Sequence, residues 1–167
     1  MLEKPEMYPE LQVLSRIWIP LRDEVAPILY AAREIVDERA TSGAWRVLPF
    51  RVKPEDRGRF SAETIALARS KAPDLCRIIE EVPRLHAYYL SIVAPGRAIR
   101  THSHRMALTA ASLCLSGGVG AYLEIDGERH AQHNGSLHIY DQRRPHGVVN
   151  DGGAARVALI VAVELRR

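Results

Sequence analysis

The spacing of apolar residues in the first half of the chain is mostly that of helices. Over residues 22–39, apolar positions recur at steps of three and four with charged residues between them, and Gly43 follows. This pattern predicts an amphipathic helix that ends at the glycine. The three prolines within residues 1–20 disfavour helix in the residues that precede them. That segment is therefore predicted to be an extended arm packed on the domain.

Two further helices are predicted before the middle of the chain. Ser61 is placed to cap a helix over residues 62–71, and Pro73 to open a shorter one that ends before Pro83. Residues 45–52 read as a short strand, at an edge because Pro49 cannot donate a ladder hydrogen bond. The first half, residues 1–83, is thus a mainly helical layer, and no cluster of chemical interest is visible in it.

The second half changes to short runs rich in β-branched and aromatic residues. Gly, Asn or Asp breaks fall between these runs, which is the pattern of many short strands joined by turns. The runs are residues 88–93, 110–115, 121–125, 137–140 and 157–163. We expect one domain over residues 1–167, mainly β with N-terminal helices. Its core over 84–167 would be a double-stranded β-helix, a jelly-roll or cupin-like barrel buttressed by the helices.

Composition excludes several partner classes. The net charge of +3 is spread along the chain, without a dense basic tract, so we expect no nucleic-acid partner. No apolar run approaches the ~20 residues that span a membrane, and the first residues lack an apolar signal core. Cys76 and Cys114 lie in apolar surroundings, which suits buried reduced thiols. We therefore expect a cytoplasmic protein with no membrane partner.

Three of the seven histidines stand in a pattern typical of metal ligands. His102 and His104 are two residues apart after the Pro95-Gly96 turn, a spacing that puts both imidazoles on one face of a strand. His146 comes 42 residues after His104 and opens another β-branched run. Imidazoles from separate strands bind Fe(II), Zn or Cu and leave coordination positions open. The remaining histidines are expected to be surface or hydrogen-bonded residues: His86, His130, His133 and His138.

Arg156 needs a partner because it lies early in an otherwise apolar strand. An unpaired guanidinium inside a barrel is too costly to keep. The partner could be an internal acid, or it could be a ligand carboxylate held by two parallel hydrogen bonds. Ser91, on a strand that leads to His102, could donate its hydroxyl to the same carboxylate. The residues alone leave both readings open.

The second half resembles the aspartyl/asparaginyl β-hydroxylase family of Fe(II)- and 2-oxoglutarate-dependent oxygenases. Order and spacing agree through about residues 75–165, and Trp45 to Pro49 is similar to the family's upstream strand. The matching pieces are residues 91–102, 112–115, 127–129, 134–135, 137–141, 146–151 and 156–163. Several spaced motifs in register make this resemblance fairly specific.

The resemblance implies a set of catalytic and cofactor-binding residues. His102 and His146 would be the catalytic iron ligands, and Arg156, helped by Ser91, would bind the distal carboxylate of 2-oxoglutarate. With Fe(II), 2-oxoglutarate and O₂, the enzyme would hydroxylate a C–H bond of a small polar substrate such as an amino acid or metabolite. The chain carries no transmembrane or repeat region, and in this it resembles the small bacterial-type hydroxylases.

The chain departs from the family pattern in two parts of the site. His104 stands where relatives of this barrel carry an acid or a glycine, so it would either be a third metal ligand or lie beside a metal-bound water. Ala110 and Ser112 fall near the family's Arg and His that hold the inner carboxylate of 2-oxoglutarate, and neither can do that job. What holds the inner carboxylate is left open.

Two other functions fit the same residues. Gly96 with His102 and His104 matches the first cupin motif, although its glutamate is absent, and Gly135 with His146 partly matches the second. A three-histidine cupin dioxygenase would need no 2-oxoglutarate, and Arg156 would hold the substrate's own carboxylate. A non-catalytic barrel that binds a small acid is the third reading.

Two weaker expectations concern partners. The arm of residues 1–20 could serve a homodimer contact. Cationic residues near the histidine motif could meet an anionic substrate, and these are Arg97, Arg100, Arg105 and Arg143.

Overall fold

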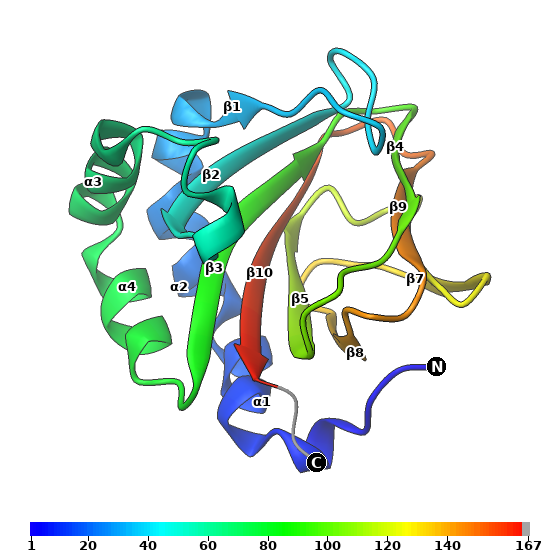
Figure 1. Cartoon of the computed structure of the whole chain (residues 1–167), viewed down its shortest axis with the longest axis horizontal. Coiled ribbons are helices and arrows are strands. Elements are labelled where there is room, and N and C mark those ends of the chain that lie inside the picture. The colour runs from blue at the N-terminus through cyan, green and yellow to red at the C-terminus, as the bar shows by residue number, and fades with distance from the viewer. Residues whose placement is uncertain (165–167) are drawn as a thin grey trace.

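The computed structural model describes residues 1–164 as two antiparallel sheets that face each other, with helices over the outer face of the larger sheet (Figure 1). The six-stranded sheet has the order β1-β2-β3-β10-β5-β8, and the four-stranded sheet has the order β4-β9-β6-β7. Strands distant in sequence pair within both sheets, β3 with β10 and β4 with β9. This is the double-stranded β-helix that the sequence predicts.

The strands and helices have the following bounds. The strands are β1 (Arg33–Glu34), β2 (Trp45–Arg51), β3 (Leu85–Val93), β4 (Arg97–His102), β5 (Leu108–Ser116), β6 (Ala121–Ile125), β7 (Glu128–Ala131), β8 (Leu137–Asp141), β9 (His146–Asn150) and β10 (Arg156–Glu164). The α-helices are α1 (Pro9–Arg16), α2 (Trp18–Val25), α3 (Ala62–Lys71) and α4 (Pro73–Glu80). Single 3-10 segments cover Pro5–Met7, Ala26–Ala31 and Pro54–Asp56. No helix in this described part of the chain is long and apolar enough to cross a membrane.

Side-chain alternation along the large sheet creates two separate cores. On β10, Leu159 and Val161 belong to the core between the sheet and the helices. Ala158 and Ile160 belong to the core between the two sheets. Because successive side chains of a strand point to opposite faces, one apolar strand contributes to both cores. The inner core, between the sheets, is where a barrel of this kind can hold a cavity.

Several predicted elements are confirmed. The α3 helix begins after Ser61, whose hydroxyl oxygen accepts a hydrogen bond from the amide of Thr64, and α4 begins at Pro73. The five predicted strand runs are all present within the ranges of β3, β5, β6, β8 and β10. Both cysteines are buried and free, as expected. The sequence missed β7, a mostly polar strand that follows the Asp126-Gly127 turn.

The prediction of an extended arm over residues 1–20 is wrong. The segment forms the first 3-10 turn, α1 and the beginning of α2. Pro5 and Pro9 each stand in a first helical turn, and Pro20 is the third residue of α2. At these positions the missing proline N–H would have had no intrahelical partner, so the prolines are compatible with helix. Leu11 and Leu14 of α1 are fully buried.

The prediction of one helix over residues 22–39 is also wrong. The α2 helix ends at Val25, and a 3-10 segment that contains Pro27 follows it. Pro27 cannot continue the α-helical ladder, because it lacks the N–H and its ring clashes with the preceding turn. The chain then forms the short strand β1, and Gly43, with φ of 75°, lies in the turn toward β2.

The strand predicted at an edge is β2. The short strand β1 pairs with β2 only at Arg46 and Val47, so Pro49 has no strand beside it on that side.

Candidate metal centre

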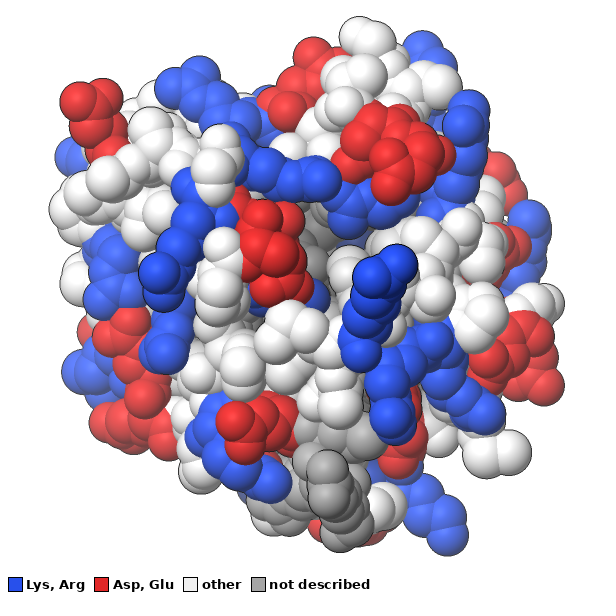
Figure 2. Space-filling model, in the orientation of Figure 1, with Lys and Arg blue, Asp and Glu red and all other residues white. Residues whose placement is uncertain are grey.

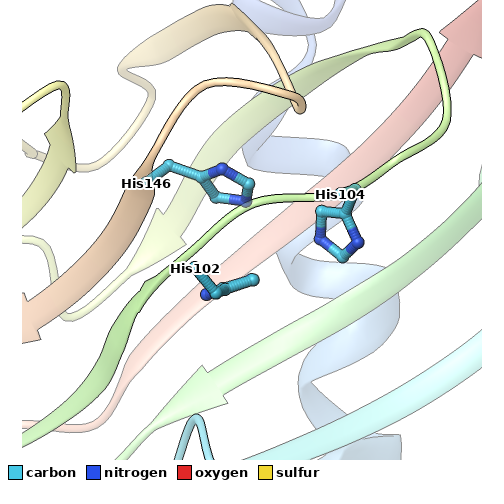
Figure 3. Close-up of side chains that lie close together, drawn as sticks. All are labelled: His102, His104 and His146. Carbon is cyan, nitrogen blue, oxygen red and sulfur yellow. The ribbon is translucent and has the colours of Figure 1, made fainter.

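Three histidines gather at one end of the space between the sheets (Figure 3). One ring nitrogen from each of His102, His104 and His146 lies within 4.8 Å of the others. Their ring centroids are 4.5 Å apart for His102 and His146, and 5.2 and 5.4 Å for the pairs that include His104. With metal–nitrogen bonds of about 2.1 Å, two ligands of one ion are at most about 4.2 Å apart. The three nitrogens would therefore have to move closer together for all of them to bind one ion.

His102 and His104 do not share one strand face, which corrects the sequence prediction. His102 is the last residue of β4 and pairs with His146, the first residue of β9. His104 lies in the loop after β4, not on the strand. Its position is fixed by its backbone amide, which donates a 2.9 Å hydrogen bond to the carbonyl of Gln142. The loop turns His104 back toward the other two histidines (Figure 3).

Backbone carbonyls orient two of the three imidazoles. Nδ1 of His102 lies 2.8 Å from the carbonyl oxygen of Arg100, and Nδ1 of His146 lies 2.8 Å from that of Arg144. A carbonyl only accepts, so each Nδ1 must carry the proton, and each Nε2 keeps its lone pair. This is the tautomer that a metal ligand needs, and such carbonyl contacts are the usual support of a ligating histidine.

The surroundings keep the imidazoles neutral. Burial lowers the pKa of His102 below its ordinary 6.5, although its bond to the Arg100 carbonyl opposes this. Burial, followed by the charge of Lys53, lowers the pKa of His104 to about 3. Burial lowers the pKa of His146 to about 4. At neutral pH all three rings therefore retain a lone pair for a metal.

The histidines and Arg156 line the same cavity. This cavity lies between the sheets and has a volume of about 860 Å³ together with its open mouth. Figure 1 looks between the sheets, and at that place Figure 2 shows a hollow flanked by both basic and acidic side chains. Apolar side chains form much of the wall, among them Val47, Ile99, Leu123 and Ile160. The arrangement offers a sheltered space with one metal-binding end.

Arg156 is fully buried and its guanidinium is only partly satisfied. Nε donates to the side-chain oxygen of Gln132 at 2.8 Å, and Nη2 donates to the hydroxyl of Ser112 at 2.9 Å. Nη1 is buried and has no partner within residues 1–164, and none of the ion pairs in that part of the chain involves Arg156. Burial lowers the pKa of Arg156 accordingly. The guanidinium thus has neutral neighbours and one donor group left for an anion.

Ser91 also lines the cavity and keeps a proton to donate. Its hydroxyl oxygen accepts a 3.1 Å hydrogen bond from the indole N–H of Trp45. Ser91 pairs with Ala158 on β10, two residues from Arg156 and on the same face of the sheet. Because the oxygen is occupied as an acceptor, the hydroxyl hydrogen is available to a ligand oxygen. Ser112 instead serves Arg156, and Ala110 is a buried apolar residue.

The sequence missed the contribution of the first half to the cavity. Four of its charged residues lie on the wall, and these are Arg39, Lys53, Asp56 and Arg59. They fall in a turn and a loop without regular spacing, so no sequence pattern marked them. Conversely, the cavity wall does not include Arg97, Arg100, Arg105 or Arg143. Arg143, for example, pairs with Asp141 on the surface.

Comparison with known proteins decides the family. The chain matches the family model of aspartyl/asparaginyl beta-hydroxylase over residues 16–165. It belongs to this family. The predicted resemblance is therefore confirmed, and the match includes all three histidines, Ser91 and Arg156. No curated protein sequence matches the chain.

Solved cupin structures are similar to about half of this hydroxylase-family chain. A cupin domain of an XRE-family transcriptional regulator from Enterobacter cloacae is 18% identical, with 50% of this chain and 84% of that chain covered and a TM-score of 0.45. A "predicted oxalate decarboxylase" from Thermotoga maritima is 18% identical, covering 49% and 69% with a TM-score of 0.44. An RmlC-like cupin from Desulfovibrio desulfuricans is 18% identical, covering 46% and 70% with a TM-score of 0.41. The family match, together with the three histidines that could hold a metal ion, is what characterises this chain.

Proposed function

We propose that this protein is an Fe(II)- and 2-oxoglutarate-dependent oxygenase that hydroxylates a C–H bond of a small polar substrate. The observation that carries the proposal is the meeting, in one cavity, of two features. These are the three neutral imidazoles and the buried Arg156, whose Nη1 has no partner among the described residues. The first suits a metal with open positions, and the second suits a carboxylate bound a short way from it.

The donor set fits Fe(II). Nε2 of His102 and Nε2 of His146 are the natural ligands, because both Nδ1 atoms are held by carbonyls. We propose that His104 is the third ligand, since one of its nitrogens lies within 4.8 Å of theirs. Three neutral ligands leave the ion with its full positive charge. An anionic chelator such as 2-oxoglutarate would balance that charge in a site of low dielectric.

The chain's own residues would bind and orient the cosubstrate. Arg156 would donate Nη1–H to the distal carboxylate, and Gln132 and Ser112 hold the guanidinium so that this group stays in place. Ser91 would add its hydroxyl proton to the same carboxylate. The apolar wall would keep water from the reacting centre. The iron, when bound with 2-oxoglutarate and O₂, supplies the oxidising power for C–H hydroxylation.

A second function is favoured by the third histidine. In the resemblance only two histidines ligate the iron, whereas here a nitrogen of His104 also lies within 4.8 Å of theirs. A metal held by three histidines could support a dioxygenase that uses no 2-oxoglutarate, with Arg156 bound to the carboxylate of the substrate. The same geometry without catalysis would be a small-acid-binding barrel. One titration separates these functions.

The test is an anaerobic titration of the Fe(II)-loaded protein with 2-oxoglutarate, followed by the visible charge-transfer band of the chelate. The band should appear, and Arg156→Met should need at least about tenfold more 2-oxoglutarate, since a charge-assisted hydrogen bond is lost. His146→Ala should lose the iron. Arg143→Met is the matched control, because Arg143 lies outside the cavity wall, and it should titrate as the wild type does.

Other outcomes point elsewhere. Iron binding without the band or any 2-oxoglutarate affinity would leave the three-histidine dioxygenase. A protein that takes up no iron would favour the acid-binding barrel.

We also propose that the protein acts on free small molecules and does so in the cytoplasm. The two buried free cysteines support the cytoplasmic location.

A further inference from the structure

A second cation is buried in the cavity, and the proposed function does not use it. Lys53 follows β2, and the residue is only 4% exposed. Its ammonium donates a 2.7 Å hydrogen bond to the side-chain oxygen of Gln142. An ammonium has three donors, and this bond uses one of them. Lys53 lines the cavity together with the three histidines.

Lys53 forms no ion pair within residues 1–164, and its acidic neighbours Glu55 and Asp56 act on it only through their charge. The acids at the mouth are instead engaged by arginines. Asp37 accepts hydrogen bonds from Arg39 and Arg59, and Asp56 lies 3.4 Å from Nε of Arg59. Glu55 is exposed and forms no ion pair with the lysine. A buried ammonium without a counterion carries a desolvation cost that an incoming anion would offset.

Gln142 places this ammonium beside the metal centre. Its side-chain oxygen accepts from Lys53, and its backbone carbonyl accepts from the amide of His104. One residue therefore holds both the cation and the loop that carries the third histidine. Consistent with this closeness, the charge of Lys53 is the second cause of the lowered pKa of His104, after burial.

The cavity thus contains two buried cations that form no ion pair within residues 1–164, Arg156 and Lys53. We propose that Lys53 binds an oxyanion of the substrate, so that the substrate is a small organic acid whose carboxylate pairs with this ammonium next to the metal. The proposal rests on the proposed function, in which Arg156 is used by the cosubstrate. The first half of the chain lines the cavity with apolar side chains, among them Val47, Pro49 and Phe60, and also with the charged Arg39, Asp56 and Arg59. An acid with an apolar body would contact the apolar part of this wall.

The experiment compares acids with amides of the same shape, which lack the negative charge of the carboxylate. Protein loaded with Fe(II) and 2-oxoglutarate, without O₂, is titrated calorimetrically with phenylacetate and phenylacetamide, butyrate and butyramide, and L-leucine and L-leucinamide. At least one acid should bind the wild type about tenfold or more tightly than its amide. In Lys53→Met that preference should disappear while the amides bind as before.

Two variants guard against a merely structural effect. Lys53→Gln keeps a donor for Gln142 without the charge, and it should lose the same preference as Lys53→Met. Lys71→Met removes an exposed lysine at the end of α3 and should behave as the wild type does. Thermal unfolding of each variant shows whether it is folded before it is titrated.

The outcomes separate this proposal from the proposed function. Equal affinity for each acid and its amide would overturn the Lys53 proposal, as would an acid preference that survives in both Lys53 variants. A weakened 2-oxoglutarate band in Lys53→Met, with acid binding unchanged, would assign Lys53 to the inner carboxylate of the cosubstrate instead. If the wild type shows no 2-oxoglutarate band, the acids and amides are titrated into protein loaded with Fe(II) alone, and this titration still tests the Lys53 proposal. A Lys53-dependent acid preference there would support the anion site although the oxygenase had failed.

Discussion

The two faces of the six-stranded sheet are built from the same strands but have different roles. Toward the helices, β10 presents Leu159 and Val161, which are completely buried among apolar neighbours. Toward the four-stranded sheet, the same strand presents Arg156, a buried cation with an unsatisfied donor. Side-chain alternation separates these roles by one residue. The outer face stabilises the fold, and the inner face keeps polar groups for a ligand.

The largest expected effect lies on the outer face. Leu159→Ala should lower the free energy of unfolding by about 2–5 kcal/mol, because it removes buried methyl groups and leaves a cavity. The measurement is urea denaturation of the metal-free protein. Leu67→Ala, at a half-exposed position of α3, should cost less than about 1 kcal/mol. The affinity of the folded Leu159→Ala protein for Fe(II) should stay unchanged, and a large fall in it would contradict the separation of the two faces.

A smaller effect should appear as a pH dependence of the inner face. The pKa values of His104 and His146 are lowered to about 3 and about 4, and that of His102 is lowered too, whereas an unfolded histidine titrates near 6.5. Below pH 6.5 the unfolded chain therefore binds more protons than the native protein. Stability of the metal-free protein should fall as the pH falls from 6.5 toward 4.

Urea denaturation between about pH 7 and about pH 5, with a chelator present, measures this dependence. His104→Asn should flatten the slope, since it removes one of the groups that stay neutral in the fold. His133→Asn is the control, because His133 is exposed, and it should keep the wild-type slope. A stability that is constant or rises on acidification would show that these rings are protonated in the native state.

The smallest expected effect concerns Ser91. Ser91→Ala should weaken 2-oxoglutarate binding by a few-fold, because a neutral hydrogen bond to the carboxylate is worth only about 1 kcal/mol. It should also cost about 1 kcal/mol of stability, since the Trp45 indole loses its acceptor. Trp45→Phe removes the same bond but keeps the hydroxyl. Equal weakening of 2-oxoglutarate binding in both variants would mean that Ser91 acts only through Trp45.

The sequence predicted local elements well where local rules decide them. Ser61 and Pro73 mark the starts of α3 and α4, because capping and the fixed φ of proline act over one turn. It failed over residues 1–39, where proline is compatible with a helical first turn and also breaks a longer helix. Whether a proline begins a helix or breaks one depends on how the segment packs against the sheet, and no local sequence pattern indicates this. The cytoplasmic location, the single-domain boundaries and the homodimer contact stay predictions.

The sequence by itself determined the β-core, the family, and the residues that carry its motifs, because strand periodicity and motif spacing are properties of the chain. His102, His146 and Arg156 were found in this way. Only the tertiary structure decided that the buried Arg156 forms no ion pair among residues 1–164, that a backbone bond to Gln142 turns His104 toward the other imidazoles, and that Lys53 reaches the same cavity. These facts depend on contacts between residues 24 or more positions apart, such as Arg156 with Gln132, and burial is set by the whole fold.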